Sequence, residues 1–147
     1  MGYKNEGRFM VAVGAIIEHT SSGKILLLKR SLKVDFHGGI WEEVNGRMKQ
    51  FEEPESALKR EVKEETGLKI EIIKPINIFH IFRGQESKDN ELVGIIYWCK
   101  SSSKKVKLSD EHIDHKWLAP KEALELVHHK GIRKDIESFM KEKSKLR

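Results

Sequence analysis

The feature that most constrains the fold is a nearly unbroken run of apolar residues early in the chain, at residues 9–17. A strand with one face in water alternates apolar and polar residues, whereas a strand buried on both faces is apolar throughout. We therefore predict a central strand over 9–17, with other layers on both sides. Residues 24–30 follow a turn cluster that ends at Gly23, and they are predicted to pair with this strand as an antiparallel hairpin.

The pattern changes from strand to helix at Pro54. Proline suits the first turn of a helix and Gly67 suits the position just past its end, so a helix is predicted between them. Further strands are predicted at 41–44, 68–72, 76–82, 91–99 and 115–118, with a turn at Asn45-Gly46, a helix from Pro120 to about residue 127, and a last helix beyond Gly131. This order predicts an α/β fold, an α/β/α sandwich with a mixed β-sheet.

The chain has 147 residues, a length that suits one compact core, so a single domain over residues 1–147 is predicted. Its apolar runs are far shorter than the roughly 18–20 residues of a bilayer crossing, so no membrane association is predicted. The one cysteine, Cys99, allows no intrachain disulfide and no thiolate cluster for structural zinc. These features favour a reducing, cytoplasmic location.

The formal net charge is +5, and its position matters for the choice of function. Residues 130–147 hold seven bases and three acids, a net of +4, and are predicted to form a basic amphipathic helix. Such a helix suggests a different class of protein, a nucleic-acid-binding module that contacts phosphates. The segment lacks the aromatic and basic alternation of single-strand binders, so nucleic acid is the less favoured partner.

Three carboxylates share one face of the predicted helix over 54–66. Glu61, Glu64 and Glu65 are spaced i, i+3 and i+4, and like charges at such spacings destabilise a helix by roughly 0.2–0.5 kcal/mol per pair. Two interpretations are open: a solvated face whose acids are balanced by nearby bases, or a site that gathers cations.

The residues around these glutamates favour the second interpretation. Gly46 is followed after five residues by Glu52 and, after seven more, by the run Arg60-Glu61-Val62-Lys63-Glu64-Glu65-Thr66-Gly67-Leu68. These residues reproduce every fixed position of the Nudix box, a match with a chance probability well below about one in a million at average residue usage. The chain therefore resembles a Nudix hydrolase over most of its length, and the resemblance implies the Nudix-type sandwich.

The resemblance implies magnesium-dependent hydrolysis, with Mn²⁺ as a substitute. Attack by water on a diphosphate must overcome the repulsion of its oxygens, and hard cations held by carboxylates neutralise them. By resemblance the metal ligands are Glu61, Glu64 and Glu65, joined by Glu52 directly or through water. Arg60 is expected to pair with Glu52 or with a ligand carboxylate and hold it in position.

A carboxylate or a metal-bound hydroxide must also activate the water. The leading candidates are Glu61 and Glu64, with Glu111 on a later loop as a further ligand or base. Asp110 and Asp114 flank Glu111, and all three have the alternative interpretation of ordinary loop charge. Two glycines of the box are expected to serve the backbone: Gly46 by letting the chain turn beside the site, and Gly67 by ending the helix.

Two positions depart from the family pattern. The chain has Val44-Asn45-Gly46 where many members have Pro-Gly-Gly, and we expect the turn to be preserved because Asn tolerates positive φ. Phe51 replaces a residue that is often small, so it either alters the entrance of the site or packs against the loop.

The substrate is less constrained than the chemistry. The small size resembles MutT-type enzymes, which implies a nucleoside triphosphate, (d)NTP, as the substrate. ADP-ribose, nucleotide sugars and dinucleoside polyphosphates are the alternatives. Candidate substrate-binding residues are Trp41, Phe82 and Arg30, with core packing or solvated surface as the alternative for each. Dimerisation is common in the family, so a homodimer is a further expectation.

Overall fold

The computed structural model describes residues 7–146 of the chain. Within that range lie seven strands and three helices: β1 (Met10–His19), β2 (Ile25–Arg30), β3 (Trp41–Glu42), β4 (Val44–Arg47), α1 (Pro54–Thr66), β5 (Glu71–Phe82), β6 (Glu91–Ser101), β7 (His112–Leu118), α2 (Pro120–Leu126) and α3 (Lys130–Ser144). The strands form one sheet in the order β3-β2-β1-β6-β5, with β4 paired to β1 and β7 paired to β2.

Strand β1 lies at the centre of the sheet, as its apolar run predicts. It pairs in parallel with β6 over its whole length, from Met10 opposite Leu92 onward. Its other edge is shared by β4 and β2, which are both antiparallel to it, and Glu18 opposite Ile25 confirms the predicted hairpin with β2. The sheet therefore mixes parallel and antiparallel pairs.

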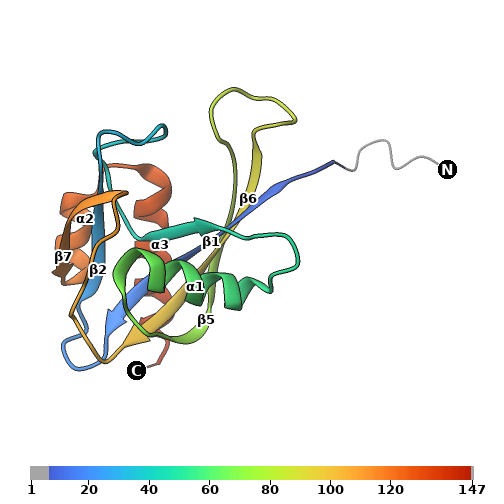
Figure 1. Cartoon of the computed structure of the whole chain (residues 1–147). Coiled ribbons are helices and arrows are strands. Elements are labelled where there is room, and N and C mark those ends of the chain that lie inside the picture. Colours follow the sequence, from blue (N-terminus) through green and yellow to red (C-terminus); the bar gives the residue numbers. More distant parts are fainter. Residues whose placement is uncertain (1–6, 147) are drawn as a thin grey trace.

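Helices cover both faces of this sheet (Figure 1). On one face, Val13 and Ala15 of β1 belong to the same buried cluster as Leu58 of α1. On the other face, Ile16 belongs to a cluster with Phe139 of α3 and with residues of α2. Successive residues of β1 thus enter different cores, which explains why the run is apolar throughout. The predicted α/β/α sandwich with a mixed sheet is confirmed.

Strand β5 differs from its prediction. The two strands expected at 68–72 and 76–82 are one strand, which is interrupted only by register shifts against β6 between Ile72 and Lys74 and between Pro75 and Asn77. Pro75 has no N–H to donate, and proline is tolerated where a strand is irregular or lies at the edge of a sheet. Because β5 is the last strand of the sheet order, it meets both conditions.

The prediction of a turn at Asn45-Gly46 is wrong. Both residues lie in β4, where they pair with Gly14 and Val13 of β1, and neither has a positive φ. The chain instead passes from β3, which pairs with β2, to β4, which pairs with β1, with Glu43 between them. Sheet pairing overrides the local turn preference of the Asn-Gly pair.

Phe51 occupies the left-handed region in the loop that follows β4, with a φ of 69°. Its side chain is fully exposed. It therefore does not pack against the loop, which was one of the two expectations for this residue.

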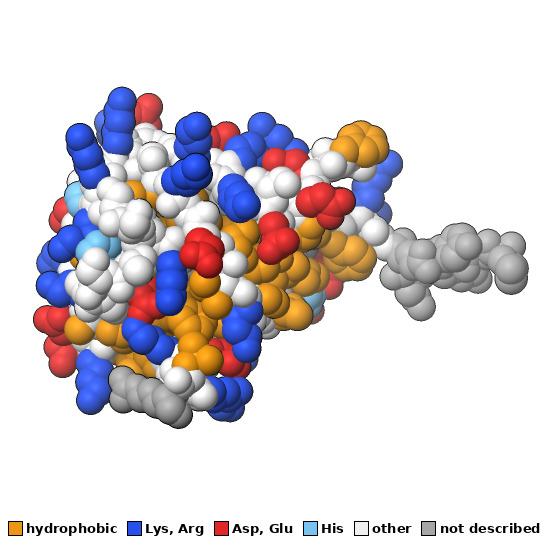
Figure 2. Space-filling view, turned by 90° about the horizontal axis from the view of Figure 1, so that it is seen from below, with side chains coloured by type: hydrophobic (Ala, Val, Ile, Leu, Met, Phe, Trp, Pro, Cys, Tyr) orange, Lys and Arg blue, Asp and Glu red, His pale blue; other side chains and the backbone are white. Residues whose placement is uncertain are grey.

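The basic amphipathic helix is confirmed as α3, with Ile132, Ile136 and Phe139 buried and Met140 partly buried. Some of its bases are bound within the molecule: Arg133 donates to the carbonyls of Leu124 and Val127, and Lys143 pairs with Glu18. On the face that Figure 2 shows, basic and acidic side chains are interspersed. No helix within residues 7–146 combines the length and apolar character needed to cross a membrane.

Candidate active site

Arg60, in the middle of α1, contacts three of the glutamates named above: Glu52, Glu61 and Glu64. Its Nε and Nη2 donate to the two oxygens of Glu52 at 2.7 and 2.9 Å. Its Nη1 donates to Glu61 at 2.9 Å and to Glu64 at 3.2 Å, and Nη2 also reaches the carbonyl oxygen of Arg47. The guanidinium thus compensates the like charges on the helix face, since its planar fork suits several carboxylates at once.

Glu52 is held in the loop before α1 by both of its oxygens. Besides Arg60, the backbone N–H of Lys49 donates to Oε1 at 2.7 Å. The hydrogen bonds from Arg60, and then that from Lys49, lower the pKa of Glu52 to about 2. Glu52 is therefore ionised near neutral pH, and it anchors Arg60.

Glu61 and Glu65 lie one helical turn apart and both line a cavity. Burial raises the pKa of Glu61. Burial, followed by the charges of Glu42, Glu61 and Glu111, raises the pKa of Glu65 to about 9. The Oε2 atom of Glu65 is buried and has no hydrogen-bond partner among the described residues. The Glu65 carboxyl group is therefore held where ionisation is unfavourable unless positive charge arrives.

Glu64 differs from its two neighbours. Its side chain is 55% exposed, accepts a 3.2 Å hydrogen bond from Arg60, and does not line the cavity. The helix therefore presents Glu61 and Glu65 to the cavity and Glu64 beside them, toward solvent.

Glu111 comes from a remote part of the chain, the loop before β7. Its carbonyl accepts the N–H of Ser31 at 2.8 Å, which ties this loop to the end of β2. Its side chain lines the same cavity as Glu61 and Glu65, and its charge acts on both of them. Of its flanking acids, Asp114 bonds to the N–H of His115 instead, and neither Asp110 nor Asp114 lines the cavity.

The cavity has a volume of about 660 Å³ and is lined from both helical layers. The α1 layer contributes Glu61 and Glu65, and the α3 layer contributes Ile132 and Asp135. Its lining combines apolar side chains with many charged and polar ones. A space of this size suits a small organic ligand such as a nucleotide.

The sequence profile of the family described as NUDIX domain matches residues 8–140. The chain belongs to the NUDIX family.

Individual relatives agree with this membership. The chain is 28% identical over 118 residues to the CTP pyrophosphohydrolase of Escherichia coli K12, covering 80% of this chain and 82% of that protein. It is 27% identical over 129 residues to an octanoyltransferase of Myxococcus xanthus, but it spans only 35% of that protein's length. The crystal structure of a MutT protein from Methanosarcina mazei Go1 superimposes with a TM-score of 0.79 at 26% identity, covering 94% of this chain and 97% of that one.

The carboxylates of this Nudix hydrolase fit a hard divalent cation by their chemistry. They offer oxygen donors only, and the buried Oε2 of Glu65 has no other partner among the described residues. Within residues 7–146, no group of three or more His, Cys, Asp or Glu side chains is already converged on one point.

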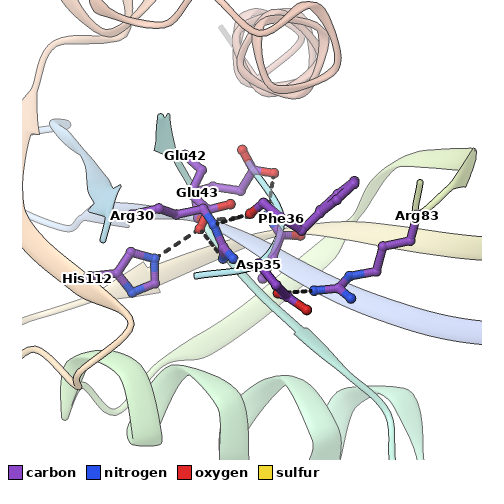
Figure 3. A network of polar contacts seen from close by, with 8 residues as sticks. Arg30, Asp35, Phe36, Glu42, Glu43, Arg83 and His112 are labelled. Atoms are coloured by element: carbon purple, nitrogen blue, oxygen red, sulfur yellow. Dashed lines mark hydrogen bonds and ion pairs between the residues drawn. The ribbon is translucent and has the colours of Figure 1, made fainter. Parts of the chain in front are cut away.

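Two of the three predicted substrate-binding residues, Arg30 and Phe82, line the Nudix cavity. Arg30 is held in place by its Nη1, which lies 3.2 Å from Glu42 Oε2, and by its Nε, which donates to the carbonyl of Phe36. The same Glu42 oxygen lies 2.9 Å from His112 Nε2 (Figure 3).

Trp41 is not brought into the cavity. It packs against the cluster under α2 and α3, and the ammonium groups of Lys29 and Lys116 lie 5.9 and 5.4 Å from its ring centroid. In β3 it pairs with Lys29 of β2, and it is not among the residues that line the cavity.

Sequence reasoning missed several polar residues that line the cavity. Among them are Glu42, Glu43, Asn45, Asn77 and Asp135. One signal was present in the sequence: two adjacent acids interrupt a short segment predicted as a strand at 41–44. The contribution of Asp135 from α3 depends on tertiary packing, which no spacing along the chain reports.

Gly46 has a different role from the one expected. A Cβ at this position would lie 2.0 Å from Cδ of Glu61, so the Glu61 carboxyl group rests directly on the backbone of β4. Gly67 does end α1 as predicted, with a φ of 74° and its N–H bonded to the carbonyl of Lys63.

This contact predicts the effect of Gly46→Ala. The new methyl group should displace the Glu61 carboxyl group, lowering turnover by about 100-fold and stability by about 1–3 kcal/mol. Steady-state hydrolysis and thermal unfolding measure the two effects. Gly7→Ala is the matched control because nothing lies within 4 Å of its added Cβ. Unchanged turnover in Gly46→Ala would show that the position of Glu61 does not matter.

Proposed function

We propose that this Nudix hydrolase cleaves a phosphoanhydride bond of a nucleoside diphosphate linked to another group, with nucleoside triphosphates, (d)NTPs, as the main substrate class. The observation that carries the proposal is the position of Glu61, Glu65 and Glu111, which line one nucleotide-sized cavity while Arg60 holds Glu61 from outside it. The similarity to a CTP pyrophosphohydrolase over four-fifths of both chains supports the substrate class.

The proposed ligands for a divalent cation are Glu61, Glu64 and Glu65, with Glu52 keeping Arg60 in place. When bound, Mg²⁺ or Mn²⁺ supplies positive charge that neutralises the phosphate oxygens and the carboxylates. Arg60 orients Glu61 by the 2.9 Å bond to its Oε1 and Glu64 by the 3.2 Å bond to its Oε2. Without that guanidinium, repulsion would spread the three box carboxylates apart.

The proton of the attacking water needs an acceptor in the cavity. Glu61 and Glu111 both line it, whereas Glu64 does not. We therefore assign the base to Glu61 or Glu111, and the bond that breaks is the one from the attacked phosphorus to the bridging oxygen. Arg30 and Phe82 are proposed to contact the substrate, and the proposed compartment is the cytoplasm.

A nucleotide panel tests the proposal. With Mg²⁺, the protein should release pyrophosphate or a nucleoside monophosphate from at least one of canonical or oxidised (d)NTPs, ADP-ribose, nucleotide sugars, dinucleoside polyphosphates and capped RNA. EDTA should abolish release, and added Mg²⁺ or Mn²⁺ should restore it. Salt-sensitive binding to long DNA or RNA, with no hydrolysis of any nucleotide, would contradict the proposal and favour a nucleic-acid-binding module.

A further inference from the structure

Arg30 belongs to a network of polar side chains from three strands. Arg30 ends β2, Glu42 ends β3 and His112 begins β7. One oxygen of Glu42, Oε2, lies 3.2 Å from Arg30 Nη1 and 2.9 Å from His112 Nε2, and Figure 3 shows the three side chains together. A carboxylate only accepts hydrogen bonds, so Nε2 of His112 is the donor. Arg30 and Glu42 line the cavity and His112 does not, so His112 acts on the cavity through Glu42.

A register shift between β2 and β7 produces this arrangement. Lys29 pairs with Asp114, but the next residue of β2, Arg30, pairs with His112, so Ile113 is passed over. Paired residues of antiparallel strands project to the same side of the sheet, and the shift therefore places Arg30 and His112 on one side. Ile113 is left 57% exposed, although it is a large apolar residue. Bulges of this kind re-aim side chains and are common beside active sites.

Stability alone does not explain why these polar groups are buried. The side chain of His112 is 1% exposed and that of Glu42 is 9% exposed. Nδ1 of His112 is buried and has no hydrogen-bond partner among the described residues, which costs free energy of folding. Well-packed apolar residues often replace a buried ion pair with no loss of stability. The polar network therefore points to a role at the cavity.

The guanidinium of Arg30 keeps free donors beside the cavity. Its Nε donates to the carbonyl of Phe36 at 3.1 Å, and its Nη1 donates to Glu42. Within residues 7–146, neither N–H of Nη2 has a hydrogen-bond partner. A planar guanidinium that is bonded at two of its nitrogens has a fixed orientation, so the direction of the remaining N–H groups is fixed as well. Phosphate oxygens are acceptors that suit such donors.

We propose that His112 and Glu42 are positioning residues, which hold Arg30 against the phosphate chain of the substrate. The inference rests on the proposed function, because it assigns a task within the same cavity. His112 fixes the carboxylate of Glu42, Glu42 fixes Nη1 of Arg30, and Nη2 remains to bond a phosphate oxygen. Without His112, the Glu42 carboxylate can turn, and the guanidinium turns with it.

His112→Leu tests the first link, because it removes the donor and keeps an apolar side chain in the buried position. We expect KM to rise by roughly 10- to 100-fold with little change in kcat, since the lost contact is to oxygens of the bound substrate and of the transition state alike. A residue that served only the fold would lower the amount of active protein, and so kcat, at an unchanged KM. An unchanged KM in His112→Leu would overturn the proposal.

Two amide variants separate the donor from the shape of the ring. In His112→Gln the amide nitrogen can lie where Nε2 lies, so KM should stay close to that of the unmodified protein. In His112→Asn the amide is too short to reach Glu42, so KM should rise as in His112→Leu. This comparison decides the matter even if His112→Leu does not fold. Equal KM values for the Gln and Asn variants would contradict the proposal.

A double-mutant cycle shows whether His112 acts through Arg30. Arg30→Met should raise KM by itself, and adding His112→Leu to it should raise KM no further, because the positioned group is already gone. Additive effects would overturn the proposal and assign the effect to another neighbour, such as Glu111. The carbonyl of Glu111 is bonded to the N–H of Ser31, so its backbone has a support other than the His112 ring.

His19→Leu is the matched control. His19 is also a buried histidine in a strand, its Nδ1 lies 2.8 Å from Ser22 Oγ, and it does not line the cavity. Its replacement should leave KM unchanged. A rise in KM equal to that of His112→Leu would show that the loss of any buried histidine has this effect.

Binding of inorganic pyrophosphate separates this inference from the proposed function. Pyrophosphate with Mg²⁺ is titrated calorimetrically into the unmodified protein, His112→Leu and His112→Gln, so that no nucleotide needs to be hydrolysed. Weaker binding to the Leu variant than to the other two supports the inference even if no nucleotide in the panel is hydrolysed, in which case the proposed function alone fails. Equal affinities, or no binding to the unmodified protein, overturn the inference even if (d)NTPs are hydrolysed.

Discussion

Glu64→Gln is expected to lower Mg²⁺-dependent hydrolysis by about 100-fold or more while leaving the fold intact. We propose this glutamate as a metal ligand on the family resemblance, and an amide is a far weaker ligand for a hard cation than a carboxylate. The fold should tolerate the change because the side chain is 55% exposed and its contact with Arg60 is long, at 3.2 Å. A partly exposed ion pair of this kind contributes about 0–1 kcal/mol.

The measurement is steady-state turnover across a Mg²⁺ titration, with thermal unfolding beside it. Glu55→Gln is the matched control, since Glu55 is an exposed acid in the first turn of the same helix. Near-normal turnover in Glu64→Gln would remove this residue from the site. The metal would then have to be held by the carboxylates that line the cavity: Glu61, Glu65 and Glu111.

Arg60→Ala is expected to affect both stability and activity. The guanidinium donates to Glu52, Glu61 and Glu64, and its removal leaves three carboxylates without their shared cation. We expect the free energy of unfolding to fall by about 2–4 kcal/mol, because partly buried charges lose their partner. Turnover should fall as well, since Glu61 would no longer be held on the backbone of Gly46.

The conservative variant Arg60→Lys separates charge from geometry. Lysine keeps the positive charge but cannot bond both oxygens of Glu52 and also reach Glu61. We expect it to recover part of the stability measured by chemical denaturation and little of the turnover. Added Mg²⁺ should stabilise Arg60→Ala more than the unmodified protein, because the ion relieves the same repulsion. Equal turnover of Arg60→Lys and the unmodified protein would show that charge alone suffices.

Much of the fold was predictable because local patterns and tertiary structure agree. Pro54 and Gly67 bound α1 as expected, and the continuous apolar run over 9–17 becomes β1, with its successive side chains in two cores. The failures lie where pairing overrides local preference. Asn45-Gly46 joins a strand because β1 offers partners on that edge, and Pro75 is absorbed by the irregular register of an edge strand.

The candidate site also has some features that the sequence predicts and others that depend on tertiary packing. The box residues are placed by one helix and its preceding loop, so helical spacing alone indicates that Glu61 and Glu65 share a face. Spacing does not indicate that Glu61 enters the cavity while Glu64 faces solvent, because the surroundings of α1 decide that. Trp41 was a reasonable candidate as an aromatic residue near the box, but the pairing of β3 with β2 directs it elsewhere.

By itself, the sequence determined the family and the carboxylate chemistry of this protein, because the Nudix box concentrates its residues in 23 consecutive positions, from Gly46 to Leu68. Only the tertiary structure decided the rest. It brings Glu111 to the box from the loop before β7, gives Gly46 its place beneath Glu61, and brings Glu43 and Asp135 into the lining of the same cavity. The physical reason is that such contacts depend on how a mixed sheet is paired and covered on both faces.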